Sequence, residues 1–415
     1  MSNLKDRFLR YVTFDTKSDA ASDTCPSTPG QRVFAEALVE EMKAIGIADA
    51  FVDGHGYVYG TIPANLEGDV PVVGFIAHMD VASEVPSTGI RARVVEKYDG
   101  GDILLNAEKG LSLSPAEFES LKKVVGHALI VTDGTTLLGG DDKAGIAIIL
   151  TMADRLIRDP SIKHGTIKLG FTPDEEIGRG ADLFDVKGFG ADFAYTVDGG
   201  AFGGMEYETF NAASAVVTFT GRSIHPGGAK GKLLNASLLA MEFHGLLPAA
   251  ERPEHTEGRE GFYHLISIKG ETERAELRYI LRDHDRGILE GRKARMQAGA
   301  DFLTGKYGEG CVSVELRDTY ANMYEMILPH WHIVETAYEA IRELGGQPVS
   351  MPVRGGTDGC RLSFMGLPCP NLPTGGRGAH GRFEYVSVDE MALSVELLIR
   401  IAQKYGQKTR EELGG

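Results

Sequence analysis

Short apolar runs alternate with helical stretches in the first and last parts of this 415-residue chain, and this alternation limits the possible folds more than any other feature. Strands that alternate with helices typically form a largely parallel sheet covered by helices. The sequence therefore predicts an α/β fold. The expected strands are 70–77, 128–132, 166–171, 193–197 and 349–352. The expected helices are 145–156, 331–344 and 388–405.

Two further helices are expected before the first strand. Apolar residues recur at helical spacing from Leu4 to Val12, which indicates the first of them. The second follows the run Thr-Pro-Gly-Gln at 28–31, which is typical of a capping box with proline at the first helical position. We expect this second helix to bury four apolar side chains, namely Val33, Phe34, Leu38 and Met42.

A different order of elements interrupts this pattern after about residue 210. We expect a strand, a helix, two strands, a helix and a strand, at 215–221, 235–247, 262–270, 275–283, 286–303 and 311–317. The order βαββαβ is the split-βαβ, ferredoxin-like unit. The chain is also longer than one hydrophobic core usually supports. We therefore expect a main domain formed by 1–209 and 324–415, with 210–323 inserted as a second domain.

Composition and charge exclude several classes of protein. With 42% apolar and 25% charged residues, the chain has the composition of an ordinary globular protein. The net charge of −16 repels phosphate backbones and anionic lipids, so we expect neither nucleic acid nor a membrane as partner. No signal-peptide-like or membrane-spanning run is present. The four cysteines lack the CxxC spacing of thiolate zinc sites and do not suggest a disulfide framework, so we expect a cytoplasmic protein.

Two groups of polar residues lie where a metal site could form. His78 and Asp80 are two residues apart at the end of an expected buried strand, so their side chains face the same way. A carboxylate beside a histidine often orients a metal-bound imidazole, although the pair alone also fits an ordinary strand end. Asp141 and Asp142 precede an apolar helix. A helix cap explains one of these aspartates but does not require both.

Negative charge is also concentrated after the next two strands. Three successive acids, Asp174 to Glu176, follow the run 166–171. They repel one another unless a cation is bound, although a solvated loop is also possible. Asp198 follows the next strand, and His380 lies in a glycine-rich loop. Because ligands collect at the carboxyl ends of strands in open α/β sheets, we expect these residues to converge.

The set of converging side chains predicts the kind of metal. It offers carboxylates and imidazoles without thiolate, which suits zinc, manganese or cobalt. Two histidines and three carboxylates are too many for one tetrahedral zinc ion. They fit a pair of ions about 3.5–4 Å apart that share a bridging carboxylate.

Together, these residues resemble the co-catalytic zinc peptidases, a family that includes aminoacylase and succinyl-diaminopimelate desuccinylase. The resemblance covers essentially the whole chain and rests on His78-Met79-Asp80, Gly140–Gly145, Asp174-Glu175-Glu176, Asp198 and His380. Three further runs look most like those of the tripeptide aminopeptidases in this family. They are Pro26–Gln31, Ser223–Gly227 and Arg354–Gly359.

The resemblance implies two zinc ions per subunit, with Mn²⁺ or Co²⁺ as possible substitutes. His78 and Asp198 would bind one ion, and Glu176 and His380 would bind the other. Asp141 would bridge the two ions. The main domain would therefore be the catalytic domain.

The resemblance also implies catalytic and substrate-binding residues. Asp80 would orient the histidine of the first ion, and Glu175 would be the general base. His225, expected in a glycine-rich loop of the inserted domain, would stabilise the oxyanion, so that this domain acts as a lid. Arg282 and Arg354 would bind the substrate carboxylate. Arg354, which opens a glycine-rich loop expected on the catalytic domain, is the better candidate, since an ordinary surface arginine also explains Arg282.

Three further points follow from the resemblance. The Asp141–Asp142 peptide bond is expected to be cis. The tripeptide aminopeptidases have an asparagine two residues before the last histidine, where this chain has Gly378. The resemblance therefore does not predict the substrate contacts beside this position. The inserted domain is expected to form a homodimer interface.

The sequence therefore predicts a metallo-aminopeptidase that hydrolyses the N-terminal peptide bond of tripeptides. A related two-zinc dipeptidase, carboxypeptidase or amide deacylase is an alternative. A non-catalytic metal- or peptide-binding module is an alternative of another class, because fold alone does not establish activity. Glu175 argues against such a module, since binding alone needs no base beside the metal.

Two other polar clusters are not expected to be functional. His330 and His332 flank Trp331 near the start of a helix, where their side chains point to different faces. Asp283 and Asp285 are expected to lie in a solvated turn at the end of a strand.

Overall fold

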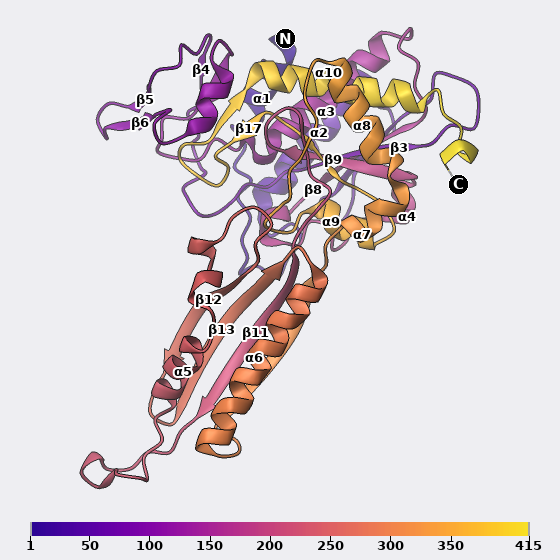
Figure 1. The fold of residues 1–415 in the computed structure, drawn as a ribbon. Coiled ribbons are helices and arrows are strands. Elements are labelled where there is room, and N and C mark those ends of the chain that lie inside the picture. The colour runs from indigo at the N-terminus through magenta and orange to yellow at the C-terminus, as the bar shows by residue number, and fades with distance from the viewer. Residues whose placement is uncertain (1, 414–415) are drawn as a thin grey trace. The chain divides into compact units, whose positions relative to one another are not determined.

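The computed structural model describes residues 2–413, which divide into two compact units (Figure 1). The first unit contains the residues up to 207, Glu325–Met351 and the residues from 357 onward. The second unit contains Glu208–Tyr324 and Pro352–Gly356. Arg354 therefore belongs to the second unit, whereas the sequence placed it on the catalytic domain.

A six-stranded sheet forms the centre of the first unit, in the order β1-β2-β8-β3-β9-β16. The four strands β8, β3, β9 and β16 run parallel, while β2 and β1 pair antiparallel at one edge. Every residue of β3 is buried, as expected for the interior of a covered parallel sheet. The predicted largely parallel sheet is confirmed. The bounds are β1 Phe51–Val52, β2 Val58–Ile62, β3 Val73–His78, β8 Ile167–Thr172, β9 Phe193–Gly199 and β16 Asn371–Pro373.

Helices cover this sheet. Helix α3 packs on β3 and β9, and it also contacts α1 and α10. Most of its residues are buried, because it lies between the sheet and other helices. The helices of this unit are α1 Ser2–Tyr11, α2 Pro29–Ile45, α3 Gly140–Arg158, α4 Val186–Phe189, α8 His332–Glu343, α9 Asp358–Phe364 and α10 Val388–Tyr405. The short helix α7, Tyr324–Ile327, begins at the last residue of the second unit's first segment.

The start of α2 differs from the prediction. Thr28 precedes the helix but makes no side-chain cap, and its hydroxyl instead donates to the backbone oxygen of Lys17. Gln31 is buried, and its amide donates to Asp174 at 2.7 Å. The prediction of a capping box was therefore wrong, because the side chain of Gln31 binds the distant Asp174 and not the start of its own helix. Val33 is 56% exposed and was wrongly placed in the core, whereas the other three expected side chains are buried.

The run 128–132 also differs from the prediction. It contains β7, Leu129–Val131, which lies outside the central sheet. It belongs to an antiparallel sheet in the order β17-β18-β7-β4, with bounds β4 Arg93–Val95, β17 Gly376–Arg377 and β18 Tyr385–Ser387. Two small sheets complete the unit, formed by the hairpin β5 Ile103–Asn106 with β6 Leu111–Leu113, and by β10 Gly204–Met205 with β15 Val349–Ser350.

The second unit has the predicted order βαββαβ. Its strands form one antiparallel sheet in the order β12-β13-β11-β14, and α5 and α6 pack on one face (Figure 1). Alternate residues of β11 and β13 point into the core beneath the helices. The bounds are β11 Asn211–Thr220, α5 Ala236–Gly245, β12 Phe262–Gly270, β13 Arg274–Asp283, α6 Arg286–Tyr307 and β14 Val312–Tyr320.

The expected solvated turn at Asp283 and Asp285 is correct only for Asp285, which is exposed. Asp283 is buried and accepts hydrogen bonds from Nε and Nη2 of Arg292, at 3.1 and 3.0 Å. Asp285 caps α6 by accepting a bond from the backbone N–H of Ile288. The prediction failed for Asp283 because its partner comes from the second turn of the following helix.

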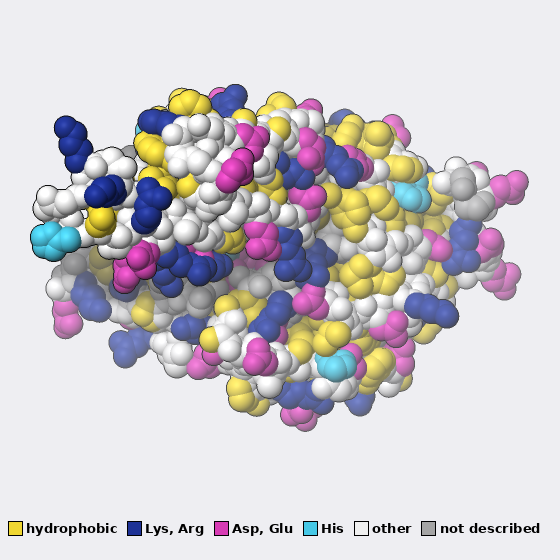
Figure 2. Space-filling model, turned by 90° about the horizontal axis from the view of Figure 1, so that it is seen from below, with side chains coloured by type: hydrophobic (Ala, Val, Ile, Leu, Met, Phe, Trp, Pro, Cys, Tyr) yellow, Lys and Arg dark blue, Asp and Glu magenta, His cyan; other side chains and the backbone are white. Residues whose placement is uncertain are grey.

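Both signs of charge occur on the surface. Acidic and basic side chains are interspersed on the face shown in Figure 2. The net charge of −16 nevertheless gives the whole molecule an acidic excess that repels anions at long range. Within residues 2–413, every helix is too short or too polar to cross a membrane.

His332 begins α8 and is half-buried. Its Nδ1 lies 3.0 Å from the hydroxyl of Tyr405, and its ring packs edge-on against Phe193. Burial, together with the charges of His330 and Lys408, lowers the pKa of His332 to about 4. These contacts give His332 a structural role.

We predict that His332→Gln makes folding less sensitive to acid. Between pH 6.5 and about 4, the unfolded chain binds a proton at this position and the folded protein does not. The stability contributed by the neutral imidazole is therefore complete above pH 6.5 and is lost as the pH falls toward 4. Melting temperatures measured from pH 7 to pH 4 should fall less steeply in this variant. The exposed His55 of the same unit provides the control, because it does not contact His332. His55→Gln should keep the wild-type slope, and equal slopes in all three proteins would contradict the prediction.

Candidate metal centre

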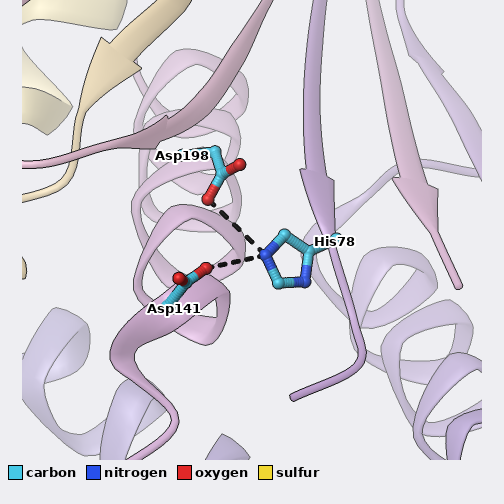
Figure 3. A group of neighbouring side chains, drawn as sticks. All are labelled: His78, Asp141 and Asp198. Atoms are coloured by element: carbon cyan, nitrogen blue, oxygen red, sulfur yellow. Dashed lines mark hydrogen bonds and ion pairs between the residues drawn. The ribbon is translucent and has the colours of Figure 1, made fainter. Parts of the chain in front are cut away.

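Five ligand-type side chains of the first unit lie close together. Nε2 of His78 lies 2.8 Å from Oδ1 of Asp141 and 3.5 Å from Oδ1 of Asp198 (Figure 3). Nε2 of His380 lies 2.8 Å from Oε2 of Glu176 and 3.3 Å from Oδ2 of Asp141. The five residues thus form two groups of three that share Asp141, and the ligand atoms of each group lie within 4.8 Å of one another.

The fold explains why these side chains meet. His78 ends β3, Asp198 lies near the end of β9, and Glu176 lies in a short 3₁₀ turn, Glu175–Ile177, that follows β8. These three strands are parallel neighbours, so their carboxyl ends lie at the same edge. Asp141 is the second residue of α3, and His380 follows β17. The prediction that the ligands follow strand ends of a single sheet was thus correct for the residues after β3, β8 and β9. It was wrong for Asp141 and His380, because β7 and β17, which precede them, belong to the antiparallel sheet.

The start of α3 places the shared carboxylate. Asp141 has non-helical φ and ψ angles, and its two oxygens face different histidines. The Asp141–Asp142 peptide bond is cis, as predicted. Asp142 is buried, and its carboxylate accepts bonds from the backbone N–H groups of Gly145 and His78, at 3.1 and 3.3 Å. Asp142 is therefore the aspartate that caps the helix, which leaves Asp141 free to face the histidines.

Asp80 supports two parts of the site at once. Its Oδ1 lies 3.4 Å from Nδ1 of His78, and its backbone oxygen is closer to the same nitrogen, at 3.1 Å. Its carboxylate also accepts bonds from the backbone N–H groups of Glu175 and Glu176, at 2.9 and 3.1 Å. The sequence indicated the first contact only. The second one ties the 3₁₀ turn to the end of β3.

Asp174 is held by a network that the sequence did not reveal. Its carboxylate accepts bonds from the backbone N–H and the hydroxyl of Ser27 and from the amide of Gln31. The side-chain oxygen of Gln31 in turn accepts a bond from the backbone N–H of Asp174 at 3.0 Å. Asp174 is therefore stabilised by these donors. The run Pro26–Gln31 contained the signal, but it was interpreted as a helix cap and a family resemblance, not as a partner of Asp174.

Burial shapes the electrostatics of the ligand groups. Burial and the neighbouring charge of Asp141 raise the pKa of Glu176 to about 7, and burial also raises the pKa of Asp198 to about 7. Hydrogen bonds to Asp141 and Glu176 raise the pKa of His380 to about 11. Oε1 of Glu176 is buried and accepts no hydrogen bond from the described residues. Carboxylates that are crowded and incompletely bonded in this way suit a bound cation.

Glu175 lies beside this centre and is half-buried. Burial, together with the charges of Asp358, Asp198 and Glu176, raises the pKa of Glu175 well above its usual range, although the charge of His78 opposes this shift. The carboxylate of Asp358, which the sequence did not single out as a site residue, accepts a bond from the hydroxyl of Thr172 at 2.7 Å.

The other three predicted residues belong to the second unit. His225 is exposed and lies in a loop, as predicted, where its Nδ1 accepts a bond from the backbone N–H of Gly227. Arg282 donates to the backbone oxygen of Arg354 at 2.9 Å and lies over the ring of Tyr320. The roles proposed for these residues stay predictions.

Arg354 already has several acceptors in its own unit. Its guanidinium donates to the backbone oxygens of Gly258 and Glu260, at 3.0 and 2.8 Å, and to the hydroxyl of Thr256 at 2.8 Å. It also packs over the rings of Phe210 and Phe262, with its central carbon 5.2 and 5.6 Å from the ring centres. These contacts hold the glycine-rich segment 352–356 in the second unit.

A cavity of about 230 Å³ opens beside the shared carboxylate. Small residues form much of its wall, and Gly378 is one of them, in a left-handed conformation with φ of +70°. Arg377 is fixed by two bonds to Glu390, at 2.7 and 2.9 Å. The lining residues are Asp141, Asp142, Asp198, Gly199, Gly200, Thr374, Gly376, Arg377, Gly378, Ala379 and Glu384.

Carboxylates and imidazoles gathered at the carboxyl edge of an α/β sheet, beside a small cavity, are the arrangement of a hydrolase that uses metal ions. Residues 129–404 match the model of peptidase family M20/M25/M40. The chain is 54% identical over 406 residues to Peptidase T of Geobacillus thermodenitrificans, covering 98% of this chain and 99% of the relative. It is 52% identical over 400 residues to Peptidase T of Bacillus subtilis, covering 96% and 98%. This chain belongs to peptidase family M20/M25/M40.

Solved structures agree with this fold. The crystal structure of the aminopeptidase PepT from Bacillus cereus superposes with a TM-score of 0.76 at 24% identity, covering 98% of this chain and 99% of the other. A tripeptidase from Staphylococcus aureus gives a TM-score of 0.77 at 22% identity, with the same coverage. Sheet and helices are thus arranged as in these peptidases.

Proposed function

We propose that this protein is a two-zinc aminopeptidase that removes the N-terminal residue of tripeptides. The observation that carries the proposal is the shared Asp141, whose two oxygens face His78 and His380 in separate ligand groups. A carboxylate in this position suits a pair of metal ions. The relatives that are 51–54% identical are named Peptidase T, which supports a peptide substrate.

The five ligands would hold the ions in two groups. His78 and Asp198 would bind one ion, Glu176 and His380 the other, and Asp141 both. The buried, unpaired Oε1 of Glu176 supports this assignment, as does the absence of thiolates from both groups. Mn²⁺ or Co²⁺ could replace zinc in such a ligand set. When bound, the ions would lower the pKa of a water molecule and polarise the scissile carbonyl.

Glu175 would move the proton in this reaction. It would take a proton from the attacking water and return it to the departing amine. Its raised pKa favours return of the proton, and the bond from its backbone N–H to Asp80 fixes its position. His225 would donate a hydrogen bond to the oxyanion, so that the second unit acts as a lid. Arg282 and Arg354 would bind the substrate carboxylate.

The net charge and the cysteines support a proposal about the partners and the cellular location of the enzyme. The net charge of −16 does not favour nucleic acid or anionic membranes as partners. None of the four cysteines, which all lie within residues 2–413, forms a disulfide bond, and this suits a reducing cytoplasm. We further propose a homodimer that forms through the second unit.

The activity predicts a specific pattern of products. A free tripeptide should yield its first amino acid and a dipeptide, whereas an N-acetylated tripeptide should resist cleavage and a dipeptide should react slowly. Chromatography with mass spectrometry of reactions with purified, zinc-loaded protein would identify the products. Release of the C-terminal residue would indicate a carboxypeptidase, and unimpaired cleavage of the blocked peptide would exclude an aminopeptidase.

Glu175→Gln should abolish turnover and leave two zinc ions bound, because the amide keeps the shape of the side chain but cannot accept the proton. Elemental analysis after gel filtration would give the zinc content. The neighbouring variant Glu176→Gln provides the comparison and should lose zinc. The opposite pattern would mean that the roles of the two glutamates are reversed.

His225→Ala should lower kcat by about 10²–10³-fold, the usual loss for one oxyanion donor, with zinc content unchanged. His255 is an exposed histidine of the same unit, so His255→Ala is a suitable control and should keep the wild-type kcat. A normal kcat in His225→Ala would remove His225 from the mechanism.

A further inference from the structure

Glu384 is only 2% exposed, and its carboxylate accepts three backbone hydrogen bonds from one loop. Its Oε2 accepts from the N–H groups of Leu138 and Gly139, both at 2.8 Å. Its Oε1 accepts from the N–H group of Asp141 at 3.0 Å. Bonds from N–H groups to a charged oxygen are stronger than bonds between neutral groups. The carboxylate therefore fixes the backbone that leads to, and includes, the shared ligand.

The loop is shaped closely around this carboxylate. A methyl group added to Gly140 would lie 2.9 Å from Oε1 of Glu384 and 2.5 Å from a side-chain carbon of Val386. Glycine is needed here because the backbone approaches both side chains. A small displacement of Glu384 would consequently displace the loop.

Glu384 is itself held by a rigid element. It directly precedes β18, which pairs with β7, and β7 lies just before the loop that Glu384 binds. It also follows His380 by four residues. One segment of chain therefore provides a ligand of the second group and holds the ligand that both groups share.

We propose that Glu384 is a positioning residue that fixes Asp141 and thereby sets the affinity of both ligand groups for metal ions. The inference rests on the proposed function only in taking Asp141 as the shared metal ligand. A positioning residue and a simple helix cap differ in what their loss changes. A cap would change the stability of the fold, whereas a positioning residue changes the affinity for zinc.

Glu384→Gln tests the inference without a peptide substrate. The amide has one acceptor oxygen in place of two, so it cannot accept all three backbone hydrogen bonds. Its NH₂ group would face a backbone N–H, which is also a donor. We expect the apparent zinc Kd, measured by competition with a chromophoric chelator, to rise about 10–100-fold. At saturating zinc, two ions should still bind and KM should be unchanged.

Glu41→Gln is the matched control. Glu41 is another largely buried carboxylate of the first unit with three donors, which are Arg7, Arg10 and Tyr11. This variant should lose thermal stability but keep the wild-type zinc Kd. A Glu384→Gln protein that also melts earlier while its zinc Kd stays unchanged would overturn the inference and leave Glu384 as a cap.

Gly140→Ala provides an independent test that changes no ligand and no charge. Its added methyl group should push Glu384 from the loop and weaken zinc binding in the same direction. A wild-type zinc Kd in this variant would also overturn the inference. If the wild-type protein itself bound no zinc, the proposed function would fail rather than the role of Glu384.

Discussion

The contact of one carboxylate with two imidazoles is the interaction on which this site depends. Asp141 faces His78 with one oxygen and His380 with the other, and each histidine belongs to a different ligand group. Buried carboxylates in such proximity repel one another and raise each other's pKa, as for Glu176. The surrounding fold must therefore hold negative groups together, and the backbone bonds to Asp80 serve this purpose.

The two units contribute different chemistry. The first unit contains all five ligand-type residues together with Glu175. The parallel strands of its central sheet position three of the ligands, His78, Glu176 and Asp198. The second unit contains His225, Arg282 and Arg354, the residues proposed to bind substrate and oxyanion. Arg354 is bonded to backbone oxygens of its own unit and helps to hold segment 352–356 there. In the proposed mechanism, the second unit thus recognises the peptide while the first unit cleaves it.

The parts of the site that depend on local sequence pattern could be predicted. Strand ends followed by His78, Glu176 and Asp198 could be predicted because parallel neighbours place their carboxyl ends together. Features that depend on distant partners could not. Gln31 and Asp174 are 143 residues apart, so the run around Gln31 looked like a helix cap. The strands β7 and β18 are even further apart in the sequence, so the apolar run of β7 could not show which sheet it joins.

The most direct test of the account is a crystal structure of the zinc-loaded protein with data collected on both sides of the zinc absorption edge. The account predicts two anomalous peaks, one at His78 and Asp198 and one at Glu176 and His380. Each peak should lie about 2.0–2.2 Å from an oxygen of Asp141. A single peak, or two ions with no common bond to Asp141, would contradict it.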